Sequence, residues 1–240
     1  MNKSKGQSRK NQSQSPAQKG KKLVNKFHFI DMEKWPRAQT YYFFTRSVKP
    51  QSYTVNITLD VTVLRNILKS KEIKFFPACL YFVSRAIERQ QELRLALEND
   101  RLGYWDYLNP QYPVFHADDK TMTFLWTEYN QDFKVFYEQY LNDNIQYGND
   151  HSIISSKGAP PKNSYIIACV PWFSFNSFAM HINPEGYYTP LIEIGKFSES
   201  NGIITMPISI TMNHAAADGY QIKVFLDELQ DTINHPEQWL

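Results

Sequence analysis

Residues 203–235 read IITMPISITMNHAAADGYQIKVFLDELQDTINH, and this stretch decides the fold. Apolar residues alternate with others from Ile208 to Met212, as they do on one face of a β-strand. Over 219–235 the apolar residues recur at helical spacing and form one face of an amphipathic helix. His214 continues the alternation of the strand and stands before the helix begins. The stretch therefore predicts a strand, a loop that carries a histidine, and a helix that covers the strand.

The rest of the chain shows both helical and strand patterns. Pro36 suits the first position of a short helix over 35–47, and Asp60 can cap a second helix that follows it. A long helix is expected over 76–97. Further strands are expected at 53–59, 104–105, 112–116, 121–126, 165–170 and 191–197, with a helix at 132–147 and a loop at 148–163. Together these patterns predict an α/β fold, an α+β two-layer sandwich in which helices cover one face of a mixed, mainly antiparallel sheet.

Charge is unevenly distributed along the chain. The 240 residues have a formal net charge of +2, but residues 1–26 carry eight lysines and arginines and no acid, which leaves −6 on residues 27–240. The first segment is also rich in Gln, Ser and Asn, so we expect a disordered basic tail over 1–26 and a single domain over 27–240. Such a tail can attract nucleic acid or a membrane surface weakly, but a solvated leader with no specific partner is the simpler interpretation.

Composition excludes several classes of protein. No apolar run approaches the roughly 18 residues that a membrane span needs, and the basic N-terminus lacks the apolar core of a secretory signal. Cys79 and Cys169 lie in separate apolar runs, which is typical of small buried residues in a reducing compartment. Because the chain has neither a C-x-x-C motif nor a histidine-rich cluster, we expect no disulfide and no metal site. The reducing compartment that the cysteines indicate leads us to expect a cytoplasmic location.

Two segments carry candidate chemistry. A neutral imidazole at His214 could remove a proton from a hydroxyl near neutral pH, while Asp218 could cap the helix or pair with an arginine. A lone histidine beside an apolar strand is more often structural, so this motif alone does not establish catalysis. The second segment, VPWFSFNSF at 170–178, places three polar side chains among large rings. They could meet a ligand or bond to local backbone.

Several blocks in order make the sequence recognisable. From Phe27 to Asp231 the chain resembles the chloramphenicol acetyltransferases that end in H-H-x-x-x-D-G followed by an amphipathic helix. The matching blocks are WPR (35–37), KFFPACLYFVSRAIERQQELRLAL (74–97), LNPQYPVFH (108–116), VPWFSFNSF (170–178), GKF (195–197), NHAAADGY (213–220) and FLDELQ (225–230).

The resemblance implies a transferase that moves acetyl from acetyl-CoA, a co-substrate, to a hydroxyl of chloramphenicol, which confers antibiotic resistance. It implies a homotrimer with active sites between neighbouring subunits. His214 matches the catalytic base. Asp218 matches an aspartate that pairs with an arginine, here Arg37, and holds the active-site loop. A bidentate contact suits this task.

The resemblance also places aromatic side chains in the acceptor pocket. Phe115 matches a residue that lines the chloramphenicol site, and Phe43, Phe44 and Phe178 fall at further lining positions. From the residues alone, all four could equally belong to the core.

Three positions depart from the family pattern. Ala168 stands where relatives carry a serine whose hydroxyl stabilises the oxyanion, and the loss of one such donor typically lowers the rate about 10²–10³-fold. Asn213 replaces the first histidine of the usual pair. Glu193 replaces a threonine that helps to solvate the transition state, and a carboxylate there would oppose a developing negative charge.

These departures keep two alternatives open. The first is the same chemistry with a different small alcohol as acceptor. The second is a catalytically degenerate trimer that binds a small molecule or, through its tail, an acidic partner. The catalytic cores of dihydrolipoyl acyltransferases share the fold, but residues 1–26 are too short and polar to be a lipoyl domain or a subunit-binding domain.

Overall fold

The computed structural model describes residues 25–181 and 185–240. The predicted disorder of residues 1–24 therefore concerns a segment outside the described residues. Asn25 and Lys26, which we assigned to the tail, are instead held in place. The Asn25 side chain donates to Tyr107 O at 3.0 Å, and the Lys26 amide donates to Asp106 Oδ2 at 2.9 Å.

The central sheet has the strand order β2-β10-β8-β7-β5-β6, with the short β9 paired to β10. The two pairs that include β7 are parallel and all others are antiparallel, which confirms a mixed, mainly antiparallel sheet. The strands are β2 (Ser52–Asp60), β5 (Asn109–Phe115), β6 (Met122–Trp126), β7 (Ser164–Val170), β8 (Leu191–Gly195), β9 (Ser198–Ser200) and β10 (Ile203–Asn213).

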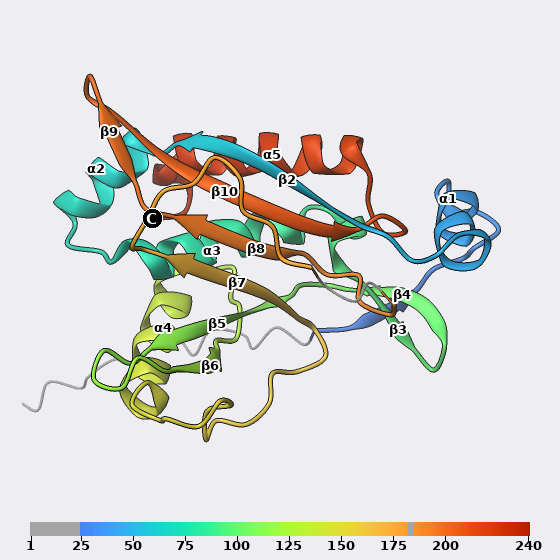
Figure 1. Ribbon diagram of the computed structural model, residues 1–240, viewed down its shortest axis with the longest axis horizontal. Helices are drawn as coiled ribbons and strands as arrows, with labels where there is room; N and C mark the ends of the chain where they lie inside the picture. Colours follow the sequence, from blue (N-terminus) through green and yellow to red (C-terminus); the bar gives the residue numbers. More distant parts are fainter. Residues whose placement is uncertain (1–24, 182–184) are drawn as a thin grey trace, which may run out of the picture.

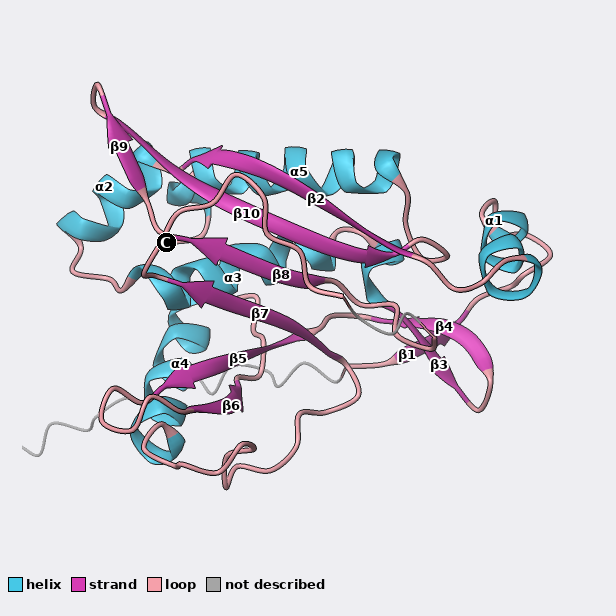
Figure 2. Cartoon of the chain, in the orientation of Figure 1, coloured by secondary structure: helices cyan, strands magenta, loops and turns pink. Residues whose placement is uncertain are grey.

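Helices cover one face of this sheet, as the sequence predicts (Figures 1 and 2). They are α2 (Thr62–Ser70), α3 (Phe75–Glu88), α4 (Phe133–Tyr147) and α5 (Gly219–Asn234), and the short α1 (Ala38–Tyr42) lies beyond one end of the sheet. Ile208 and Ile210 of β10 are fully buried on the helical side together with Phe225 of α5. The alternation that defined the strand thus selects the face on which the core forms. No described helix is long and apolar enough to cross a membrane.

The predicted helix over 76–97 is wrong in its second half. Helix α3 ends at Glu88, and Leu95–Glu98 forms β3, which pairs with β4 (Arg101–Trp105). Asn99 and Asp100 both have positive φ, as a tight hairpin turn requires, so they reverse the chain directly. With β1 (Phe27–Phe29), these strands make a separate sheet of order β1-β4-β3, of which the sequence predicted only the strand at 104–105.

The helix expected over 35–47 is shorter than predicted. It spans Ala38–Tyr42 and continues as a π-helical turn over Phe43–Ser47, so Pro36 precedes the helix.

The other face of the sheet is crossed by the chain between β7 and β8 (Figure 1). The amide of Phe178 donates to Asn56 Oδ1 at 2.9 Å, and Ser209 Oγ donates to Phe178 O at 2.7 Å. These two bonds attach the crossing segment to β2 and β10. Since the helices lie on the opposite side, polar side chains of β8 and β10 on this face lie beneath or beside the segment.

Candidate functional site

His214 lies on the link between β10 and α5. Its amide donates to Gln51 O at 2.9 Å, which continues the β2–β10 pairing by one more bond. The amides of Ala216 and Ala217 then both donate to Asn213 O, at 3.0 and 3.2 Å, and turn the chain toward the helix. The backbone around the histidine is therefore fixed by hydrogen bonds on both sides of the residue.

Two aromatic rings hold the imidazole of His214. Phe44 stacks on it with ring centroids 4.1 Å apart and planes 13° from parallel, and Tyr53 lies at 4.9 Å at a steeper angle. Nδ1 is buried and has no hydrogen-bond partner among the described residues. His214 as a whole remains partly exposed. Nε2 is thus the nitrogen that remains available to a substrate.

Asp218 and Arg37 form the predicted ion pair, although they are far apart in sequence. Arg37 Nη1 donates to Asp218 Oδ2 at 2.5 Å and also to Gln221 Oε1 at 3.1 Å. The contact is not the bidentate one that we expected, because a single guanidinium nitrogen makes it. Nε and Nη2 of Arg37 are buried and have no hydrogen-bond partner among the described residues.

Asp218 also begins helix α5. Its Oδ1 accepts from the Tyr220 amide at 3.0 Å, and the Gln221 side chain accepts from the Asp218 amide at 3.1 Å, which completes a capping box. Burial tends to raise the pKa of the Asp218 carboxyl, but hydrogen bonds from Arg37 and Tyr220 outweigh it, and the pKa is lowered. The residue is thus an ionised anchor that connects the helix start to Arg37.

Asn213 orders the loop from within. Its Oδ1 accepts from the Ala215 amide at 2.9 Å, and its Nδ2 donates to Tyr187 O at 3.0 Å. The side chain is 2% exposed. Asn213 therefore has a structural role, in which the carboxamide oxygen accepts one hydrogen bond and the carboxamide nitrogen donates another.

A row of side chains crosses the face of the sheet opposite the helices. Ala168 of β7 pairs with Glu193 of β8, Glu193 pairs with Ser209 of β10, and Ser209 pairs with Asn56 of β2. Glu193 is 1% exposed, and neither carboxyl oxygen has a hydrogen-bond partner among the described residues. Burial raises the pKa of this carboxyl to about 7, against a smaller lowering effect of the Ser209 hydroxyl.

The structure separates the four aromatic residues assigned to the acceptor pocket. Phe44 contacts His214, and Phe43 contacts Phe44 at 5.1 Å. Phe178 lies over β2 and β10 at one side of the sheet, where its amide donates to Asn56 Oδ1. Phe115 contacts Trp172 at 5.0 Å, at the ends of β5 and β7.

Phe115 lies far from His214 within one chain. The strand registers place it level with Pro207, six residues before Asn213 on β10. At roughly 3.3 Å per residue, this is a separation of about 20 Å along the strands. One chain therefore does not bring the predicted base and this predicted pocket residue together.

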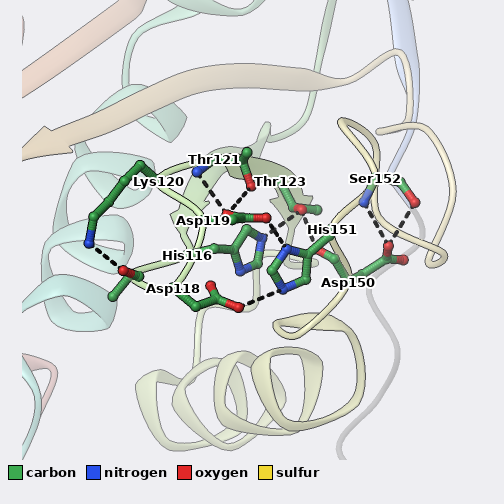
Figure 3. A network of polar contacts seen from close by, with 10 residues as sticks. His116, Asp118, Asp119, Lys120, Thr121, Thr123, Asp150, His151 and Ser152 are labelled. Atoms are coloured by element: carbon green, nitrogen blue, oxygen red, sulfur yellow. Dashed lines mark hydrogen bonds and ion pairs between the residues drawn. The ribbon is translucent and has the colours of Figure 1, made fainter.

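A hollow of about 600 Å³ adjoins Phe115, and sequence reasoning did not find it. Among its lining residues are Asp118 and His151, which with Asp119 form a surface cluster whose candidate ligand atoms lie within 4.8 Å of one another (Figure 3). His151 Nδ1 bonds Asp119 Oδ2 at 2.6 Å, and His116 stacks on the His151 ring at 4.1 Å. The partners are about thirty residues apart in sequence, so no local motif indicated them.

Comparisons of the sequence with known proteins match the chain to one family. The family model described as chloramphenicol acetyltransferase matches residues 25–230. A chloramphenicol acetyltransferase of Clostridium butyricum is 34% identical over 216 residues, which is 89% of this chain and 98% of that protein. The chain belongs to the chloramphenicol acetyltransferase family. A chloramphenicol acetyltransferase of Clostridium perfringens is 33% identical over 217 residues, with 90% and 98% of the two chains covered.

Solved structures agree on the architecture. A chloramphenicol acetyltransferase structure superimposes with a TM-score of 0.78 at 22% identity and covers 87% of this chain and all of its own. A dihydrolipoamide acetyltransferase of Azotobacter vinelandii follows with a TM-score of 0.62 at 13% identity, covering 79% and 84% of the two chains. At these identities the likeness shows the shared fold. The expected acetyltransferase fold is thereby confirmed.

Proposed function

We propose that the protein is a chloramphenicol O-acetyltransferase that uses acetyl-CoA as acetyl donor and protects a cell from the antibiotic. The observation that carries the proposal is the environment of His214 in a chain of this family. Its ring is stacked on Phe44, its loop is anchored through Asp218 to Arg37, and Nε2 is available. A base in a fixed orientation is what direct acyl transfer requires.

His214 would act at the start and at the end of the reaction. Nε2 takes the proton of the acceptor hydroxyl while the hydroxyl oxygen attacks the thioester carbonyl carbon, and the carbonyl electron pair moves onto oxygen. Collapse of the tetrahedral intermediate breaks the carbon–sulfur bond, and the CoA thiolate recovers the proton from His214. Atoms and charge balance without a metal or a redox step.

Asp218 is not a second base in this scheme. Its carboxylate accepts from Arg37 and from the Tyr220 amide, so both of its oxygens are occupied by donors. We assign it and Arg37 to positioning of the loop.

The site is completed by a second copy of the chain. The distance of about 20 Å between the levels of Phe115 and Asn213 argues that the acceptor pocket and the base come from different subunits. The face of the sheet opposite the helices also presents large exposed apolar side chains at Phe115, Met122 and Trp172. Burial of such a surface is the usual driving force for assembly, and we propose the homotrimer typical of the family.

A second hollow suits part of the acyl donor. It has about 200 Å³ and lies between α3 and the ends of β7 and β8, where Phe75, Cys169 and Phe197 line it. Lys196 lines it as well, and Arg65 lies over the Phe197 ring at 5.1 Å. Apolar walls suit the uncharged arm of acetyl-CoA, and the two cations nearby suit the phosphates at one end of it. Because acetyl-CoA is a metabolite of the cell interior, we place the reaction in the cytoplasm.

One observation favours a different acceptor as the second candidate. Glu193 and Ala168 stand where the family pattern has two hydroxyl side chains, on the face that we assign to the acceptor pocket. The polar side chains of a pocket determine which alcohol it accepts. A degenerate binding protein is the third possibility. An acceptor screen separates the three: chloramphenicol-dependent release of CoA thiol supports the proposal, release with another alcohol alone supports the second, and no release with any acceptor supports the third.

A further inference from the structure

Glu193 is the most unusual residue on the face of the sheet opposite the helices. A carboxyl that is 1% exposed normally pairs with a cation or with several donors. Here both oxygens are buried and neither has a hydrogen-bond partner among the described residues. Such a group calls for a functional explanation, and a ligand group is one of the ordinary ones.

Burial favours the neutral form of Glu193, and the Ser209 hydroxyl acts more weakly in the opposite direction. Ala168 and Ser209 flank Glu193 on β7 and β10, and the Ser209 hydroxyl donates to Phe178 O. Tyr187, on the crossing segment, is a titratable neighbour of Glu193: burial raises the pKa of its phenol, the Thr189 hydroxyl lowers it, and the charge of an ionised Glu193 raises it. The cations Lys196 and Arg37 make no ion pair with it among the described residues. Below pH 7 the carboxyl of Glu193 is mostly protonated, and it is then a hydrogen-bond donor that has no partner among the described residues.

The side chains next to Glu193 in the sheet leave no hydroxyl free to donate a hydrogen bond to a substrate. Ala168, directly across the register, offers no hydroxyl, and the Ser209 and Thr211 hydroxyls already bond to Phe178 O and Thr54 Oγ1. Ala168 itself is partly exposed, so the row reaches the surface at the residue that pairs with Glu193. A substrate oxygen bound over Ala168 would lie beside the position of Glu193 in the sheet.

We propose that protonated Glu193 donates a hydrogen bond to the oxyanion of the tetrahedral intermediate, in place of the hydroxyl that Ala168 lacks. Glu193 transfers no proton, and the base remains His214. A carboxylic acid that is kept neutral by its surroundings can serve as such a donor. The inference rests on the proposed acetyl transfer, because it assigns a role within that reaction.

The donor and the base cannot belong to one chain. Glu193 is level with Ser209, four residues before Asn213, which is about 13 Å along the strand. An oxyanion and the proton removed from the attacking hydroxyl lie within a few ångströms of each other. Glu193 of one subunit therefore serves His214 of the next.

The test compares Glu193→Gln with Glu193→Ala. Glutamine keeps a donor of the same shape but does not titrate, so it should retain most of the acetylation rate at pH 6, whereas alanine should lose about 10²–10³-fold. Above pH 7 the wild-type rate should fall, by about tenfold for each further pH unit, while the Glu193→Gln rate does not. Glu199→Gln, at an exposed carboxyl on β9, is the matched control and should follow the wild type throughout.

Mixed trimers test the shared site. Co-assembly of His214→Ala chains with Glu193→Ala chains leaves one complete site in each mixed trimer, so about a quarter of the wild-type rate should return. Recovery no greater than the average of the two parents would place both residues in one chain and overturn the proposal. Equal losses in Glu193→Gln and Glu193→Ala, or no loss in either, would also overturn it.

Two further readouts separate this inference from the proposed function. If the wild type acetylates an acceptor and His214→Ala does not, the proposed chemistry stands whatever Glu193 does. Infrared spectra at pH 6 should show a protonated carboxylic acid band that Glu193→Gln lacks, and this band needs no substrate. Its absence contradicts a neutral Glu193 even in a protein with full activity.

Discussion

Arg37 Nη1 lies 2.5 Å from Asp218 Oδ2, and this contact joins the start of the folded chain to the first turn of helix α5. Through the same nitrogen Arg37 reaches Gln221, the other member of the capping box. The ion pair and the helix cap are thus one structure, and His214 lies four residues before it. If His214 is the base, as we propose, its orientation should depend on Arg37, which is 177 positions away in the sequence.

Replacement of Asp218 by Asn should separate the ion pair from the cap. Asparagine still caps a helix, but it removes the charge that Arg37 contacts. Because the Asp218 side chain is about one-third exposed, we expect a loss of roughly 1–2 kcal/mol in unfolding free energy. The acetylation rate should fall about tenfold, which is far less than after removal of the base.

A double-mutant cycle with Arg37→Met measures the pair itself. The two single changes should be strongly non-additive, since each removes the same contact. Additive losses in the thermal unfolding midpoints would mean that Asp218 acts through the helix cap alone.

Stability should also depend on pH through Asp218. Its pKa is lowered in the folded state, so the folded protein holds fewer protons at this group than the unfolded chain. The stabilisation is complete above the ordinary aspartate value of 3.8 and is lost as pH falls below it. Unfolding midpoints of wild type and Asp218→Asn, measured from pH 6 to pH 3 at one protein concentration, should converge at the acidic end. A constant gap would show that the carboxyl titrates normally.

Phe44 should control the rate more than substrate affinity. Phe44→Leu removes the ring stacked on His214 and lets the imidazole rotate, so kcat should fall about tenfold with KM for chloramphenicol little changed. Phe43→Leu is the comparison: Phe43 is 51% exposed and contacts Phe44, so a change at this expected pocket residue should alter KM more than kcat. A rise in KM at constant kcat for Phe44→Leu would instead assign that residue to the acceptor pocket alone.

Ala168→Ser restores a hydroxyl beside Glu193, and its effect should depend on pH. At pH 6 a neutral Glu193 already supplies a donor, so the gain should be small. At pH 8.5 Glu193 is ionised, and the added hydroxyl should raise the rate by about tenfold or more. Rates at the two pH values decide this point, and an equal gain at both would mean that Glu193 contributes no donor.

Much of this fold follows from local pattern. Strand β10, the loop after it and helix α5 form as residues 203–235 predict. The spacing of the apolar residues determines which face of the strand and of the helix packs into the core. The error at Leu95–Glu98 has a physical cause. Leucine is a strong helix former, but its alternation at Leu93, Leu95 and Leu97 also fits a strand, and pairing with β4 across the Asn99–Asp100 turn selects the strand.

The candidate site was predictable to a lesser extent. Motif position indicated His214, Asp218 and Arg37, and the structure brings the last two into contact. Spacing could not indicate that Phe44 stacks on His214 or that one guanidinium nitrogen makes the ion pair. Nor could it show that Glu193 is buried with no hydrogen-bond partner among the described residues, because its burial depends on strands β7 and β10 and on the crossing segment.

The most direct test of the account is the acetylation of chloramphenicol by the wild type and by His214→Ala. The product is identified by mass spectrometry as the acetyl ester, and CoA release is followed in parallel. We expect the ester from the wild type and a loss of about 10²–10⁴-fold in kcat/KM for His214→Ala, with the fold and assembly unchanged. Acetylation at the wild-type rate by His214→Ala, or no ester from the wild type, would contradict the assignment of His214 as the base of a chloramphenicol acetyltransferase.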